Sequence, residues 1–235
     1  MRGAGSGARC AERMSDAEVA KLVAEGSYMP EKLGDFEALV ATQAKSSAYW
    51  LEANLALLRL YQFYPDRVNS ANVAVVLAKG LQRLPENDFH LYMCLLDEQM
   101  CKAGVIPALM QLQRLAETCD FAEFWEQARS GDAAGLLQSI VGFKESMQDF
   151  VAVTVGRTAR SMEAERVVRL LGVASAAEAA EVMVGRHGWT RSADGSFTAV
   201  EGKGEAAAEG AKQGAKPASM PIGIAFNAFS AMVPS

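Results

Sequence analysis

The fold of this chain depends most on residues 42–65, TQAKSSAYWLEANLALLRLYQFYP. This stretch predicts a polar turn, then a helix over residues 49–61, and an end at Pro65. At about 100° per residue, the apolar side chains of the helix fall on two nearly opposite faces, Leu51, Leu55 and Leu58 on one and Ala53, Leu57 and Leu60 on the other. A surface helix needs only one apolar stripe, so we expect neighbouring helices to cover this one from both sides.

The sequence on either side of this stretch continues the helical pattern. Ser15 and Glu18 form a capping box ahead of a first helix, and Pro30 suits the first position of a second one. Further helices are expected from four later positions: Ser70, Asp88, Pro107 and Asp120. The one at Asp88 is expected to run through FHLYMCLLDEQMC. A pair of such helices occupies about 40 residues, the length of a HEAT-type repeat, so residues 15–142 predict a helical-repeat domain with a surface for binding proteins.

Residues 143–200 show a different pattern. Three helices are expected there, over residues 143–160, 162–171 and 175–185. Asp194-Gly195 then gives a strong signal for a β-hairpin. Three helices followed by a hairpin make a winged helix. The predicted fold class is therefore mainly α, with a HEAT-like helical-repeat domain followed by a small winged-helix domain that has one β-hairpin.

The two ends of the chain differ from the rest. Residues 1–14 are small and basic and lack the apolar region of a signal peptide, so we expect a disordered extension. Residues 201–216 hold no large apolar side chain, which predicts a flexible linker. Residues 217–235 regain apolar side chains, and we expect this tail to dock on the chain's own body or on a partner, with disorder as the alternative.

Composition narrows the function classes. The 235 residues carry a net charge of −5 and have a pI of about 5.2, which argues against a polyanion-binding surface over the whole protein. The four cysteines have no zinc-ribbon or disulfide-framework spacing, which favours reduced thiols in a cytosolic or nuclear protein. No run approaches the roughly 18 apolar residues of a membrane span.

One stripe of residues looks like a metal site, but its spacing argues against one. His90, Cys94, Asp97 and Cys101 project from one side of the helix expected there. The two cysteines are about 10 Å apart along the axis, whereas two thiolates on one zinc lie within about 4 Å of each other. The sequence also lacks a G-x-S-x-G elbow and a G-x-x-x-x-G-K-[ST] loop. We therefore expect no enzyme activity and no catalytic, cofactor-binding or metal-binding residues.

Motifs in a fixed order run along most of the chain. They are YxPExL from Tyr28, AYxLEANLALLRLYQF from Ala48, LxxLPxxDFxL from Leu81, LxETCxFxxFW from Leu115, GFxxSxxxF from Gly142 and GW at Gly188. Together they resemble the family of k subunits of eukaryotic translation initiation factor three, over residues 28–200. The resemblance implies the PCI architecture, a helical-repeat domain followed by a winged helix.

The resemblance also implies a function and partners. It implies a noncatalytic, cytoplasmic scaffold subunit that helps to assemble preinitiation complexes on the small ribosomal subunit. The partners it implies are the other factor-three subunits, the l subunit directly, and the small ribosomal subunit; no cofactor, membrane or duplex DNA is expected. Two alternatives stay open: a winged-helix regulator that binds nucleic acid, and a scaffold subunit of the proteasome lid or the signalosome.

Candidate binding residues follow from the predicted winged helix. Its first two helices carry four arginines that could touch RNA: Arg157, Arg160, Arg166 and Arg169. The third helix carries Glu178 and Glu181, which repel phosphate, so duplex DNA is not expected. An edge strand can extend a neighbour's sheet, and the resemblance implies that winged helices in these assemblies join in this way. The candidate protein-contact residues lie on this edge and in the tail: Arg191, Phe197, Ala199, Val200, Ile224, Phe226 and Phe229.

Overall fold

The computed structural model describes residues 15–192 and 194–199. The chain divides into two compact units, residues 1–200 and 201–235, and the second lies outside the described residues. The expectations for the extension at residues 1–14 and for everything after residue 200 therefore concern residues outside the described part. No helix within the described part is long and apolar enough to cross a membrane.

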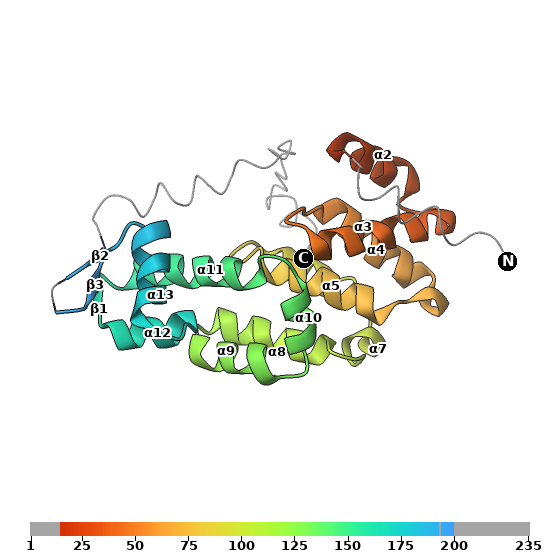
Figure 1. The fold of residues 1–235 in the computed structure, drawn as a ribbon. Coiled ribbons are helices and arrows are strands. Elements are labelled where there is room, and N and C mark those ends of the chain that lie inside the picture. The colour runs from red at the N-terminus through yellow and green to blue at the C-terminus, as the bar shows by residue number, and fades with distance from the viewer. Residues whose placement is uncertain (1–14, 193, 200–235) are drawn as a thin grey trace, which may run out of the picture. The chain divides into compact units, whose positions relative to one another are not determined.

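Helices follow one another from residue 16 to residue 139, as the sequence pattern predicts (Figure 1). Ser15 accepts the backbone N–H of Glu18 in a capping box, and Asp120 accepts that of Glu123. The elements are α2 (Asp16–Gly26), η1 (Pro30–Lys32), α3 (Leu33–Lys45), α4 (Leu51–Phe63), η2 (Pro65–Arg67), α5 (Ser70–Leu81), α6 (Asp88–Met93), α7 (Glu98–Cys101), α8 (Ile106–Glu117), α9 (Phe121–Ser130) and α10 (Ala134–Ser139).

Helix α4 lies among its neighbours as its two apolar faces predict. It packs against α2, α3 and α6. Leu57, Leu58 and Leu60 are completely buried, and Leu51 and Leu55 are partly buried against the same core. Both apolar faces are thus covered, which confirms that the helix is internal to the stack.

Buried polar groups join α4 to two of these neighbours. The side chains of Gln43 in α3 and Asn54 in α4 exchange hydrogen bonds of 2.7 and 3.2 Å. The Asn54 amide also donates to the Tyr92 hydroxyl of α6 at 3.1 Å, and the Tyr49 hydroxyl lies 2.7 Å from that oxygen. Tyr49 donates in turn to Asp88 at 2.5 Å. Because an unpaired buried polar group is costly, this network fixes how α3, α4 and α6 pack together.

The expected continuous helix after Asp88 is wrong, because the chain forms two helices there. Helix α6 ends at Met93, and the Asp97 side chain then accepts the backbone N–H of Met100 to begin α7. A side-chain cap of this kind starts a new helix. His90 and Cys101 therefore lie on different helices, and the apparent stripe of metal ligands does not exist.

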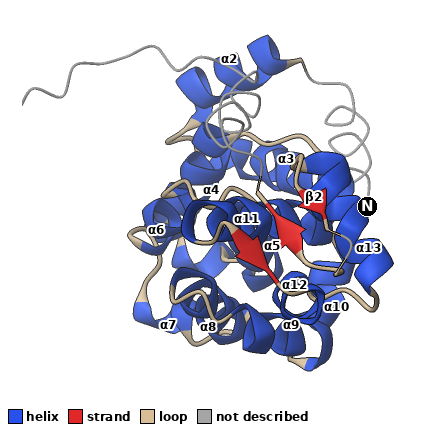
Figure 2. Ribbon diagram, turned by 90° about the vertical axis from the view of Figure 1, so that its left-hand side faces the viewer, coloured by secondary structure: helices blue, strands red, loops and turns tan. Residues whose placement is uncertain are grey.

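The carboxyl-terminal part has the order of a winged helix. Its elements are α11 (Phe143–Thr158), β1 (Ser161–Met162), α12 (Ala164–Leu171), α13 (Ala176–Ala180), the π-helix η3 (Glu181–Arg186), β2 (Thr190–Arg191) and β3 (Phe197–Thr198). The strands form one antiparallel sheet in the order β1-β3-β2, and they gather in a single place among the helices in Figure 2. The predicted hairpin is present, and β1 joins it as a third strand.

Helix α9 holds the end of α12 through one large side chain. The Trp125 indole N–H donates to the carbonyl of Leu170 at 2.8 Å. Arg129, one turn later, donates to the carbonyl of Gly172 at 3.2 Å. Both acceptors are at the carboxyl end of α12, where helix carbonyls lack partners within the helix. The winged helix is therefore bonded to the helical stack through α9.

Candidate interaction surface of the winged helix

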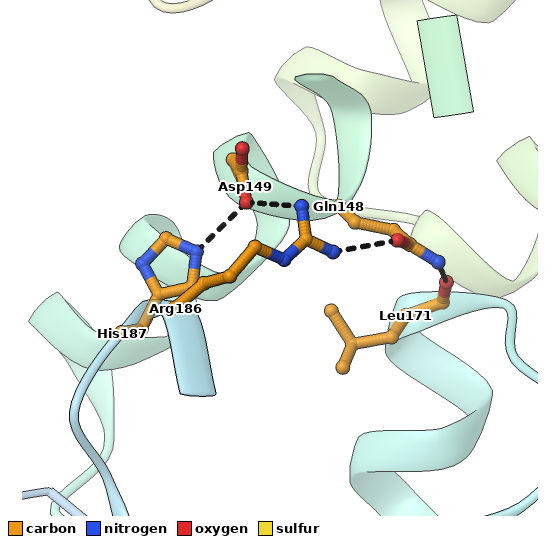
Figure 3. A network of polar contacts seen from close by, with 5 residues as sticks. All are labelled: Gln148, Asp149, Leu171, Arg186 and His187. Carbon is orange, nitrogen blue, oxygen red and sulfur yellow. Dashed lines mark hydrogen bonds and ion pairs between the residues drawn. The ribbon is translucent and has the colours of Figure 1, made fainter. Parts of the chain in front are cut away.

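A network of five residues joins the first two helices of the module to its third helical segment, α13 with η3 (Figure 3). Asp149 of α11 is the centre: one of its carboxylate oxygens lies 2.8 Å from Arg186 Nη1 and 3.0 Å from His187 Nε2. The second guanidinium nitrogen of Arg186 donates to the Gln148 carbonyl oxygen at 3.0 Å. The Gln148 amide donates to the carbonyl of Leu171 at 3.4 Å. One network thus ties α11, α12 and η3 together.

This network positions the strands that follow it. His187 is mostly buried and precedes Trp189, whose backbone N–H donates to the carbonyl of Met183 at 2.9 Å. Charge-assisted bonds to a partly buried carboxylate are stronger than bonds between neutral groups. Strand β2 therefore begins at a fixed point, one residue after the buried Trp189.

The sheet places its candidate contact residues in different environments. Phe197 lies in the central strand and is 0% exposed, so its side chain belongs to the core and cannot contact a partner. Arg191 is exposed on β2, and its guanidinium carbon lies 5.9 Å from the centre of the Phe197 ring. The Ala199 N–H donates to the carbonyl of Arg160 at 2.8 Å and is already paired. Val200 and the tail residues Ile224, Phe226 and Phe229 lie outside the described residues.

The edge expected at Phe197 is in fact the middle of the sheet. Residues 161–162 pair with β3 on the side away from β2, so the outer edges are β1 and β2. The Ser192 N–H donates to the Ser196 carbonyl at 2.9 Å, so the backbone groups of Ser192 point toward the partner strand. In an antiparallel pair, residues that point toward the partner strand alternate with residues that point away from it. The N–H and C=O of Arg191 therefore point away from β3. They are the groups that β2 offers to a neighbouring strand.

The four candidate RNA-contacting arginines are all exposed. Arg157 lies in the last turn of α11, and Arg160 lies between α11 and β1. Arg166 and Arg169 lie on α12, three residues apart and so on one face. The exposed carboxylates of Glu178 and Glu181 lie on the third helical segment, where a DNA-reading helix would carry donors. These four arginines thus lie on α11, on α12 and between α11 and β1, and not on the third segment.

Within residues 15–192 and 194–199, no group of three or more His, Cys, Asp or Glu side chains is arranged to hold a metal ion. The described cysteines are free thiols: Cys94, Cys101 and Cys119. Burial raises the pKa of the Cys101 thiol, so this group is a poorer nucleophile than an ordinary thiol.

Comparison with known proteins identifies the family of this chain. The model of the CSN8/PSMD8/EIF3K family matches residues 67–209, a range that includes the whole winged helix. Proteins named eukaryotic translation initiation factor 3 subunit K from Danio rerio and Homo sapiens are each 36% identical over 170 residues. The aligned part covers 72% of this chain and 76% and 77% of those relatives. The Drosophila yakuba protein of the same name is 35% identical over 168 residues, 72% of this chain and 74% of its own.

The chain belongs to the subunit K family. In this family member, sequence reasoning found the helices, the hairpin and the exposed Arg191, but it missed strand β1. It also missed the network around Asp149, which joins residues more than thirty positions apart. The pair His187 and Arg186 just before Gly188-Trp189 was a local sign that polar groups meet there, but their partner could not be read from the sequence.

Proposed function

We propose that this chain is a noncatalytic subunit of the eukaryotic translation initiation factor 3 complex. It acts in the cytoplasm as a protein scaffold that helps to assemble preinitiation complexes on the small ribosomal subunit. The observation that carries this proposal is its identity of 36% over 170 residues to proteins named as subunit K. A helical stack bonded to a winged helix suits the role, since both present extended surfaces to other proteins.

The outer edge of β2 is the proposed contact with another subunit, and the l subunit is the proposed neighbour. Support comes from the outward N–H and C=O of Arg191 and from its exposed side chain. An added strand gains main-chain hydrogen bonds at such an edge, and the charge of Arg191 adds selectivity. Ala199 borders this sheet, and Val200, Ile224, Phe226 and Phe229 stay in the proposal as residues outside the described part. Phe197 is not part of the proposed contact, because its side chain is buried.

The proposed contact with ribosomal RNA is secondary and uses the exposed arginines on the first two helices of the winged helix and the turn between them. Arg157, Arg160, Arg166 and Arg169 are exposed, and guanidinium groups bind phosphate well. Duplex DNA is not proposed, because Glu178 and Glu181 occupy the segment that would enter a groove. The alternative, a nucleic-acid regulator that works outside the complex, requires that phosphate contacts dominate its binding.

Gradient sedimentation tests the proposal and separates these alternatives. Lysates of cells that express the tagged chain are run on sucrose gradients at about 100 mM and at about 400 mM salt. A scaffold subunit sediments with the other factor 3 subunits at both salt concentrations, and with small ribosomal subunits at the lower one. Binding through phosphates falls steeply with salt. Sedimentation with RNA but without factor 3 subunits, lost at the higher salt, would overturn the proposal.

A further inference from the structure

Three large apolar side chains are exposed at the end of α4 and in the turn that precedes η1. Tyr28 is 65% exposed, Met29 50% and Phe63 58%. The ring centres of Tyr28 and Phe63 lie 6.2 Å apart, and the guanidinium carbon of Arg59 lies 5.8 Å from the centre of the Tyr28 ring. We call these four residues, Tyr28, Met29, Arg59 and Phe63, the aromatic patch. It lies before residue 67, where the family-model match begins, and it shares no residue with the sheet edge.

The fold holds this patch in place before any partner binds. Arg59 and Phe63 are four residues apart on α4 and so lie on one face of that helix. Arg67 of η2 donates to the carbonyl of Pro30 at 3.3 Å, which bonds the turn after α4 to the turn that carries Tyr28 and Met29. A surface fixed in this way loses little conformational entropy on binding.

The patch has the composition of a protein-binding site. Aromatic residues, Met and Arg are enriched at the centres of protein interfaces, and Tyr and Arg are also enriched among the few residues that carry most of the binding energy. The Arg59 guanidinium makes a ring contact, but within the described part of the chain no carboxylate lies within salt-bridge distance of it. Among the described residues no acidic group neutralises its positive charge, which lies beside the exposed ring of Tyr28.

We propose that the aromatic patch binds a protein segment with one large apolar side chain and an adjacent carboxylate. The apolar side chain packs against Tyr28, Met29 and Phe63, and the carboxylate pairs with Arg59. Single-stranded RNA also stacks on aromatic rings, but it brings a phosphate with every nucleotide. The two turns beside the patch expose Glu31 and Asp66 as well as Lys32 and Arg67, so their charges cancel and form no basic groove for such a chain. A peptide can place its single carboxylate at Arg59 alone.

Photo-cross-linking of the full chain identifies what occupies the patch. Purified protein with Phe63→p-benzoylphenylalanine is added to an extract of its own cells and irradiated, and the adducts are sequenced by mass spectrometry. The matched control carries the same group at Val141, which is 50% exposed and bonded through its N–H to Ala44 at the other end of α3. The proposal expects an adduct specific to position 63, on a protein segment with Asp or Glu within about one helical turn of the cross-linked residue.

Other adducts would overturn it. They are RNA nucleotides, a second copy of the chain, residues of the chain itself, a neutral or basic segment, and a pattern equal to that of the Val141 control. Absence of any adduct at position 63 would overturn it as well.

The cross-linked segment, made as a synthetic peptide, then tests the two contacts separately by fluorescence anisotropy. Phe63→Ser is expected to weaken binding about thirtyfold, as for a residue at the centre of an interface. Arg59→Gln is expected to weaken binding about fivefold, and to remove the effect of changing the peptide's carboxylate to an amide. Val141→Ser leaves the affinity unchanged. The proposal is wrong if the losses of affinity caused by Arg59→Gln and by the peptide amide are additive, because the two groups then do not interact. It is also wrong if the Phe63→Ser protein binds the peptide as tightly as the wild type.

Discussion

Gly172 sets how closely α9 and α12 approach. It ends α12 in the left-handed conformation, with φ of +61°, which favours glycine. A Cβ at this position would lie 2.3 Å from Cγ of the Trp125 ring. The same ring donates to the carbonyl of Leu170, so it cannot move away without losing a hydrogen bond. One missing side chain thus allows the winged helix to rest on the helical stack.

Gly172→Ala should lower the free energy of unfolding by about 3 kcal/mol, because it adds both backbone strain and a steric clash. Urea unfolding monitored by circular dichroism measures the change. Gly34→Ala is the matched control: nothing lies within 4 Å of the added Cβ, and alanine favours the helix by about 1 kcal/mol. A Gly172→Ala protein as stable as the wild type would show that the contact with Trp125 does not matter.

The buried tyrosines predict a loss of stability at high pH. Burial raises the pKa of Tyr92 to about 12, and it also raises the pKa values of Tyr49 and Tyr61. An unfolded tyrosine ionises near pH 10, so the stabilisation is complete below about pH 10 and falls as the pH rises above it. Burial lowers the pKa of Lys79, which acts in the opposite direction.

Urea unfolding at pH 8, 10 and 11 should therefore show a decreasing free energy of unfolding. Tyr49→Phe should reduce this dependence, because one of the shifted hydroxyls is gone. It should also cost about 1 kcal/mol at pH 8, where the hydrogen bond to Asp88 is lost. A wild-type stability that stays level up to pH 11 would contradict the assignment.

At the scale of elements, local signals were predictable and long-range pairings were not. The capping groups of Ser15 and Asp120 lie within three residues of their partners, and both were predicted. The break between α6 and α7 was missed because the apolar pattern continues through it, although Asp97 is a good capping residue. Strand β1 is two residues long and pairs with residues more than thirty positions later. Nothing in the sequence around Ser161–Met162 indicates that pairing.

The outer edge of β2 gives a prediction at the same scale. Arg191→Pro removes the outward-facing N–H without removing a bond to β3, as proline does at a sheet edge. If another subunit adds a strand there, this change should lower recovery of that subunit about tenfold in a pull-down. Arg191→Gln keeps the N–H and should lower it less. If both variants lower the recovery equally, the contact depends on the side-chain charge of Arg191 and not on an added strand.

At the scale of the whole molecule, the helical stack, the winged helix and the family could be predicted, whereas the exposure of the side chains on the proposed interaction surfaces could be predicted only in part. The exposure of Arg191 was predictable because hairpins have edges. The aromatic patch was missed because Tyr28 and Phe63 read as ordinary apolar positions, and only the packed structure leaves them exposed. Phe197 was predicted to lie at a sheet edge because only two strands were expected. The third strand, β1, pairs with its strand and makes that strand the buried middle of the sheet. The domain boundary after residue 142 stays a prediction.

Affinity purification of the tagged chain from its own cells at moderate salt, with partners identified by mass spectrometry, tests the central claim most directly. The account predicts recovery of the other initiation factor 3 subunits together with small-subunit ribosomal proteins. Recovery of proteasome-lid or signalosome subunits, or of nucleic acid without translation factors, would contradict it.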